Sequence, residues 1–103
     1  MMTGLKVCAY GEELEIATTN YRENGALAVL AFDKEGEPYG NISVNLPESA
    51  DLPEGAFYVK HWSENEPLFA ALIEQGIIEP VDAPVAESGF ISGIKAYRLR
   101  VAE

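Results

Sequence analysis

The sequence has little cysteine and histidine, and each shortage excludes a class of site. Cys8 is the only cysteine among 103 residues, so the chain cannot form an intrachain disulfide or a multi-cysteine zinc site. His61 is the only histidine, which excludes a metal site built from several imidazoles. We therefore expect a protein without metal or cofactor that resides in a reducing compartment, the cytoplasm.

Positive charge is also scarce. Seven lysines and arginines face seventeen aspartates and glutamates, which gives a net charge of -10. Because binding to phosphate backbones depends on lysine and arginine, we expect no direct contact with nucleic acid or with anionic membranes. Two interpretations of the acidity stay open: it keeps the protein soluble, or it docks on a protein partner with a basic surface.

Long apolar runs are absent as well. The N-terminal stretch MMTGLKVCAYGEE resembles neither a signal peptide nor a membrane span. Apolar residues nevertheless make up 48% of the chain, enough to form a core. We expect a single domain over residues 1–103, as a monomer or homodimer.

Short segments with alternating or continuous apolar character, separated by turn residues, predict strands. Residues 26–32 are apolar on both faces, which favours a central strand over the alternative of a short helix. We expect an α+β fold, a mostly antiparallel sheet of five to six strands with one helix packed on it. The expected strands cover residues 5–9, 13–17, 26–32, 39–46, 57–61 and 94–101.

The expected strand over residues 39–46 shows the clearest alternation. It predicts buried side chains at Ile42, Val44 and Leu46, and solvent at Asn41, Ser43 and Asn45. The stretch NLPESADLPEG that follows predicts an exposed loop, since its prolines limit continuation of the strand.

The expected helix spans Glu66–Gln75. Its apolar stripe predicts four buried side chains, Leu68, Phe69, Leu72 and Ile73. Asn65 is the preferred N-cap, which places Pro67 in the first turn; a capping box of Ser63 with Glu66 is the alternative. Gly76 predicts the C-terminal end of the helix.

His61 and Trp62 stand side by side just before this helix. Strand alternation predicts that they point in opposite directions and share no pocket. His61 has no partner in the sequence for general-base catalysis, and Cys8 is distant, so we expect no catalytic residue and no enzyme. The alternative is a small ligand-binding domain or enzyme centred on His61. Trp62 is expected to pack against the core or to anchor a partner.

Two further charged groups have structural explanations. The acids Asp33, Glu35 and Glu37 surround Gly36, but their spacing differs from that of a calcium-binding EF-hand loop, and a hairpin turn explains them better. Arg98 and Arg100 are expected on one strand face, where they balance nearby carboxylates; a small anion site is the alternative.

Four short motifs carry a family resemblance: VNLP at residues 44–47, Val59–Lys60, SENE at residues 63–66 and GIIEP at residues 76–80. With SGF at residues 88–90, they resemble a domain-of-unknown-function family of small acidic proteins encoded on phages and conjugative elements. The resemblance covers most of the chain from about Tyr21 onward. It implies a mobile-element context rather than an activity.

By analogy, small acidic proteins of such elements include inhibitors of host defence, among them anti-CRISPR proteins and mimics of DNA charge. The resemblance therefore favours a non-enzymatic acidic protein-binding module that acts on a basic, nucleic-acid-binding surface of a host protein. The expected partner-binding residues are Glu48, Asp51, Glu54, Glu35, Glu37 and Trp62.

Overall fold

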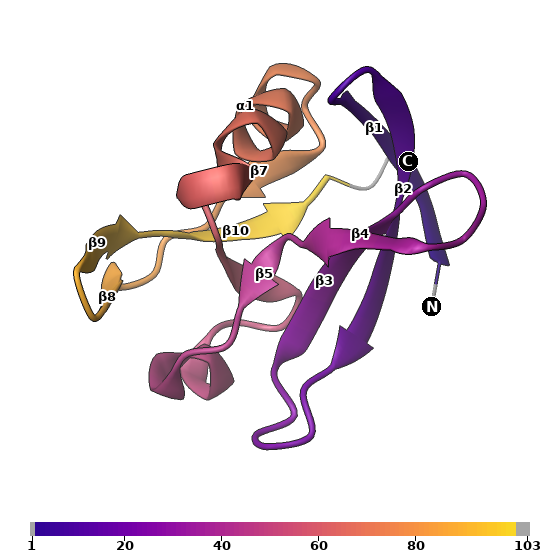
Figure 1. Cartoon of the computed structure of the whole chain (residues 1–103). Helices are drawn as coiled ribbons and strands as arrows, with labels where there is room; N and C mark the ends of the chain where they lie inside the picture. Colours follow the sequence, from indigo (N-terminus) through magenta and orange to yellow (C-terminus); the bar gives the residue numbers. More distant parts are fainter. Residues whose placement is uncertain (1, 101–103) are drawn as a thin grey trace.

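The computed structural model describes residues 2–100. They form two four-stranded antiparallel sheets, a two-stranded ribbon, two short 3-10 helices and one α-helix (Figure 1). The first sheet is a meander of consecutive strands: β1 (Met2–Ala9), β2 (Glu12–Asn20), β3 (Leu27–Phe32) and β4 (Pro38–Asn41). The α+β class is confirmed.

The second sheet gathers strands from distant parts of the chain, in the order β5, β6, β10, β7. A 3-10 helix, η1 (Pro47–Asp51), lies between its first two strands, and η2 (Ser63–Asn65) leads into the α-helix. The ribbon pairs β8 with β9. The elements are β5 (Ser43–Val44), β6 (Ala56–Val59), α1 (Glu66–Glu74), β7 (Ile78–Pro80), β8 (Ala86–Ser88), β9 (Ile91–Ile94) and β10 (Ala96–Leu99).

The expected count of five to six strands is wrong, because residues 2–100 form ten strands in three sheets. One reason is the segment 39–46, which passes from β4 in the first sheet to β5 in the second. At the crossing, the Ile42 N–H donates to the Val29 carbonyl, and the Ile42 carbonyl accepts from the Lys60 N–H, both at 2.9 Å. The backbone of Ile42 is therefore shared between the two sheets.

Ser43 is buried, contrary to the expectation of a solvent-facing side chain. Its Oγ lies 2.7 Å from the Tyr21 hydroxyl and accepts from the Val29 N–H at 2.9 Å. Because both polar contacts are satisfied inside the protein, burial of this hydroxyl is tolerated.

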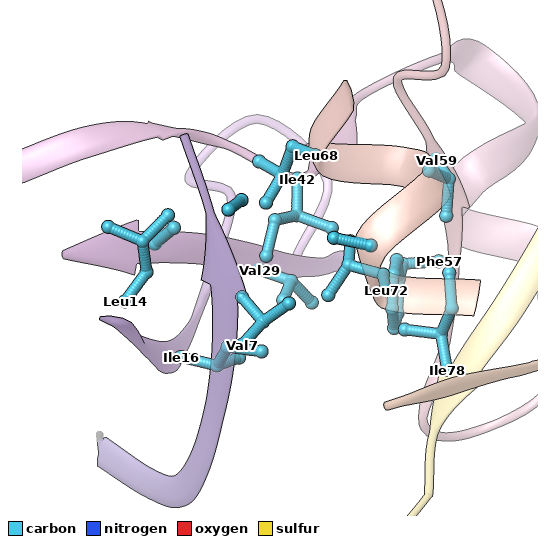
Figure 2. Close-up of a cluster of buried hydrophobic side chains, with 13 residues drawn as sticks. Val7, Leu14, Ile16, Val29, Ile42, Phe57, Val59, Leu68, Leu72 and Ile78 are labelled. Atoms are coloured by element: carbon cyan, nitrogen blue, oxygen red, sulfur yellow. The ribbon is translucent and has the colours of Figure 1, made fainter. Parts of the chain in front are cut away.

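The main core lies between the first sheet, α1 and the second sheet (Figure 2). Leu68 and Leu72 of α1 are buried in it as predicted, and Phe69 is partly buried. Ile73 is 41% exposed, so its predicted burial is wrong. A short helix resting on the core buries a narrow stripe, here completed by Ala71 at the i+3 position from Leu68.

A smaller second core covers the other face of β6. Phe57 and Val59 face the main core, whereas Tyr58 packs with Ile94 and Ala96 in the second one. The strand is therefore buried on both faces.

The predicted end of the helix at Gly76 is confirmed. Gly76 has a φ of +69°, a left-handed value that glycine adopts without a steric penalty. The Gly76 N–H donates to the Ile73 carbonyl and the Ile77 N–H to the Leu72 carbonyl, which is the hydrogen-bond pattern of a Schellman motif.

The last helical turn also covers a sheet edge. The Gln75 side-chain amide accepts a hydrogen bond from the Cys8 N–H at 2.9 Å and donates one to the Cys8 carbonyl at 2.8 Å. β1 is an edge strand, so this amide satisfies backbone groups that would otherwise be open to another strand.

Candidate functional site

The segment between β6 and the first turn of α1 separates two hollows. We call one the tyrosine pocket, of about 200 Å³, and the other the histidine pocket, of about 260 Å³. The tyrosine pocket is lined by Tyr10, Tyr39, Gly40, Glu64, Asn65 and Leu68. The histidine pocket is lined by His61, Phe69, Gly93, Lys95 and Tyr97.

Asn65 fixes the position of this segment. Asn65 is the N-cap residue of α1, as predicted, although its side chain makes no capping hydrogen bond. The Asn65 Nδ2 instead donates to the carbonyls of Asn41 at 2.6 Å and Lys60 at 3.3 Å. The residue is buried, so these bonds tie the entry of the helix to the end of β4.

The tyrosine pocket contains an unusual backbone conformation. Tyr10 and Gly11 form the two-residue turn between β1 and β2, with φ values of +55° and +75°. A turn with two left-handed residues favours asparagine or glycine at its first position, so tyrosine is strained there. Among residues 2–100, the other non-glycine residue with left-handed φ is Ser63, immediately before Glu64.

Tertiary contacts hold the strained tyrosine. Its hydroxyl donates to the Glu64 carbonyl at 2.5 Å. Its ring lies against that of Tyr39, with centroids 5.4 Å apart and planes inclined by 30°. Both rings stay partly open to solvent, at 43% and 39% exposure, so the pair presents an aromatic surface at the pocket.

Two acidic side chains, Glu12 and Glu64, lie near this pair, and only Glu64 has a cationic partner in the described chain. Partial loss of hydration, then the carboxylate of Glu12 and the neighbouring Tyr10, raise the pKa of Tyr39. Glu64 is held by the side chain of Ser63 and by Lys60, 2.9 Å away, which together lower its pKa to about 2. Within residues 2–100, Glu12 makes no ion pair, and so it supplies the uncompensated charge beside the two tyrosines.

The walls of the histidine pocket are aromatic. The His61 ring contacts Trp62 edge-on at 5.3 Å and Phe69 at 6.0 Å, and Phe69 contacts Tyr97 edge-on at 5.8 Å. The prediction that His61 and Trp62 point in opposite directions is therefore wrong. β6 ends at Val59, so the alternation of a strand no longer applies two residues later.

Polar groups at this pocket lack partners within the described chain. The His61 Nε2 is buried and has no hydrogen-bond partner among residues 2–100. Lys95 is exposed and makes no ion pair with any of these residues. Burial raises the pKa of Tyr97. The pocket thus combines the aromatic rings of Phe69 and Tyr97 with the ammonium group of Lys95 and the imidazole of His61.

Cys8 does not line the histidine pocket. Its side chain is exposed on β1, where Gln75 binds its backbone. Across residues 2–100, no group of three or more histidine, cysteine, aspartate or glutamate side chains is placed to hold a metal ion. None of the helices in this range has the length and apolar character needed to cross a membrane.

The acids expected to bind a partner fall into two separate groups. In Figure 1, the β3–β4 turn with Glu35 and Glu37 and the helix η1 with Glu48 and Asp51 project from opposite sides of the molecule. The two groups therefore form two separate acidic surfaces.

The β3–β4 turn has the expected hairpin geometry. Asp33 Oδ1 accepts from the N–H groups of Glu35 at 3.0 Å and Glu37 at 2.9 Å. The turn leads directly into β4, which carries Tyr39 of the tyrosine pocket.

The segment 47–54 is more ordered than the expected loop. Ser49 is buried, and its Oγ accepts from the Leu46 N–H at 2.9 Å. Burial, followed by the charges of Glu48 and Asp51, raises the pKa of the core residue Tyr58. Glu48, Asp51 and Glu54 remain exposed, whereas Trp62 is partly buried against the second core.

The arginines behave as expected. Glu79 on β7 lies opposite Arg98 on β10 and accepts from its Nε, and Arg100 Nε lies 3.2 Å from the same carboxylate. The prediction that the two arginines balance a carboxylate is confirmed.

Sequence reasoning missed Tyr10, Tyr39 and Lys95 as site residues. A signal for the first was present, because tyrosine occupies a turn position that favours asparagine or glycine. No sequence signal pairs Lys95 with Phe69, since the fold brings together α1 and the link between β9 and β10. Comparison with protein-family models, curated proteins and solved structures found no match to this chain.

Proposed function

We propose that this protein is a non-enzymatic binding module whose acidic surface docks on a basic protein, with the tyrosine pocket receiving a lysine or arginine side chain of the partner. The observation that carries the proposal is the stacked, exposed Tyr10–Tyr39 pair beside the unpaired carboxylate of Glu12.

The chemistry of the pocket suits a cation. The faces of tyrosine rings attract ammonium and guanidinium groups, and a carboxylate without a cation of its own adds a charge pair. The wider charge of -10 raises the rate of encounter with a basic surface. A partner cation would therefore be attracted at long range and bound at short range.

The strained turn favours a fixed binding surface. Tyr10 is held in a costly backbone conformation by its stacking on Tyr39 and by its bond to Glu64. A ring that is already immobilised loses little freedom on binding. We interpret the strain as stored in the free protein so that the aromatic surface is ready for the partner.

We place this module on a mobile genetic element that infects or enters a host cell. The resemblance to proteins of phages and conjugative elements supports an inhibitor of host defence that covers a basic, nucleic-acid-binding surface. Glu35 and Glu37 extend the acidic surface from Tyr39 along the β3–β4 turn. A second acidic surface is formed by Glu48, Asp51 and Glu54. Trp62 is a candidate aromatic anchor for the partner near this surface.

The test uses a hexalysine peptide as a minimal basic partner. Titration followed by amide NMR shifts should perturb Tyr10, Tyr39 and Gly40, and the affinity should fall as salt rises. The double variant Glu12→Gln with Tyr39→Ala should bind about tenfold more weakly, from loss of a cation–π contact and a charge pair.

The matched control neutralises the other acidic surface with Glu48→Gln, Asp51→Asn and Glu54→Gln. This control should retain the perturbation at Tyr10 and Tyr39. Shifts confined to residues 47–54, or equal binding by the double variant, would refute the tyrosine pocket as the docking site.

A second candidate function, a ligand-binding domain centred on His61, is favoured by a separate observation. The histidine pocket holds Lys95 without an ion pair beside three aromatic rings.

A further inference from the structure

We propose that the histidine pocket binds a small aromatic carboxylate, with its ring against Phe69 and Tyr97 and its carboxylate on the ammonium group of Lys95. This inference is independent of the docking function, because it involves different residues and a ligand of opposite charge.

The size of the pocket limits the ligand. Its volume is about 260 Å³, just below the range of about 300–1,000 Å³ that is typical of small-molecule sites. An apolar cavity of about 150 Å³ is sufficient to hold benzene. The pocket therefore has room for one planar ring with a small polar group, and too little for a nucleotide.

The arrangement of the rings favours an aromatic ligand. His61, Phe69 and Tyr97 form a row of tilted and edge-to-face contacts with centroid distances of 6.0 and 5.8 Å. Aromatic rings prefer such offset or perpendicular contacts at about 4.5–7 Å. A ligand ring in the hollow would continue this pattern.

Lys95 determines the sign of the ligand charge. Four of the basic residues, Lys6, Lys60, Arg98 and Arg100, already have carboxylate partners. Lys95 has none within residues 2–100, although acids outnumber bases in the chain. Among residues 2–100, no acidic side chain lines the pocket either, so none of them repels an anionic group on a ligand there.

His61 supplies a second polar contact. Its Nε2 is buried without a partner in the described chain, and such groups are rare in folded proteins. Because the imidazole also lines the pocket, we assign it a hydrogen bond to the ligand.

Benzoate is the probe for this site. Titration into the protein, followed by amide NMR shifts, should give saturable changes centred on His61, Phe69 and Lys95. Benzyl alcohol tests whether binding needs the negative charge, and cyclohexanecarboxylate tests whether it needs the aromatic ring. Inorganic phosphate tests whether any anion binds. Each of the three should bind more weakly than benzoate.

The variant Lys95→Gln should weaken benzoate binding about tenfold or more, because it removes a charged hydrogen-bond partner. Its matched control is Lys34→Gln, an exposed lysine without an ion pair in the described chain, which should leave binding unchanged. His61→Gln should weaken binding by a smaller factor, since glutamine retains polar groups but loses the ring.

Lys34 and Lys95 are both exposed, so the two lysine variants should fold as the parent protein does. Absence of saturable shifts with benzoate at millimolar concentration would overturn the proposal. Equal binding of benzoate by the Lys95→Gln variant, or binding of benzyl alcohol or phosphate as strong as that of benzoate, would overturn it too.

Discussion

The tyrosine pocket and the histidine pocket lie on two sides of the same helix start and differ in charge. Leu68 lines the first and Phe69 the second, because successive helical residues are rotated by about 100° around the axis. The charged residues of the two pockets lie on other elements. The carboxylate of Glu12, on β2, raises the pKa of Tyr39 in the tyrosine pocket, and Lys95, between β9 and β10, lines the histidine pocket. One short segment thus supports two surfaces whose chemistry is set by strands distant in sequence.

The largest effect should come from loosening the helix that both pockets share. Leu72 is buried in the main core, and Leu72→Ala should lower the free energy of unfolding by about 2–5 kcal/mol through the lost contacts and the cavity left behind. Denaturant unfolding measures this loss. Ile73→Ala, one residue further on and 41% exposed, should cost about 1 kcal/mol or less. Similar costs for both variants would contradict the observed orientation of α1.

The variant Tyr10→Asn should have a smaller effect on stability, and it distinguishes the backbone strain at Tyr10 from the role of this residue in binding. Tyr10→Asn places a residue favoured in this turn at the left-handed position and should recover about 1 kcal/mol of backbone strain. The lost ring stacking and the lost bond to Glu64 offset this gain, so stability should change by about 1 kcal/mol or less.

The same variant should bind hexalysine several-fold more weakly, because it lacks one of the two rings. Benzoate binding at the histidine pocket should be unchanged, which makes it the internal control. A variant that lost stability and both kinds of binding together would show that Tyr10 is only structural.

The smallest effect concerns Glu64, whose paired carboxylate distinguishes it from Glu12. The Ser63 side chain and Lys60 lower its pKa from 4.5 to about 2. The folded protein therefore binds the proton less readily than the unfolded chain. Its contribution to stability is complete above pH 4.5 and is lost as the pH falls through about 2.

An NMR titration of the Glu64 carboxyl carbon should place its midpoint near 2. Ser63→Ala and Lys60→Met should each raise this midpoint, whereas Lys34→Met, at a distant turn, should not. A midpoint of 4.5 in the parent protein would mean that Glu64 is free and competes with Glu12 for a cationic ligand.

Local sequence signals predicted several elements correctly. The apolar run of β3 forms an inner strand, Asp33 closes a hairpin turn, and Gly76 ends the helix. In each case the information lies within a few neighbouring residues. A run apolar on both faces requires cover on both sides, and a left-handed backbone favours glycine.

The errors have a common physical cause. Residues 39–46 alternate like one strand. The backbone of Ile42, however, forms hydrogen bonds to both sheets and divides this segment into β4 and β5. Ser43 was expected in solvent because it is polar, yet Tyr21 and Val29 satisfy its hydroxyl inside the protein. Alternation reports the local direction of side chains, and it carries no information about which other strands arrive on either side.

The sequence by itself determined the α+β class, the location of the helix, the acidity and the lack of an intrachain disulfide, because these depend on composition and on periodicities within one segment. Only the tertiary structure placed the Tyr10 ring on Tyr39 and Lys95 beside Phe69. It also left the carboxylate of Glu12 and the ammonium group of Lys95, next to those rings, without an ion pair in residues 2–100. Such neighbours lie far apart along the chain, and the packing of two sheets around one helix decides which of them meet.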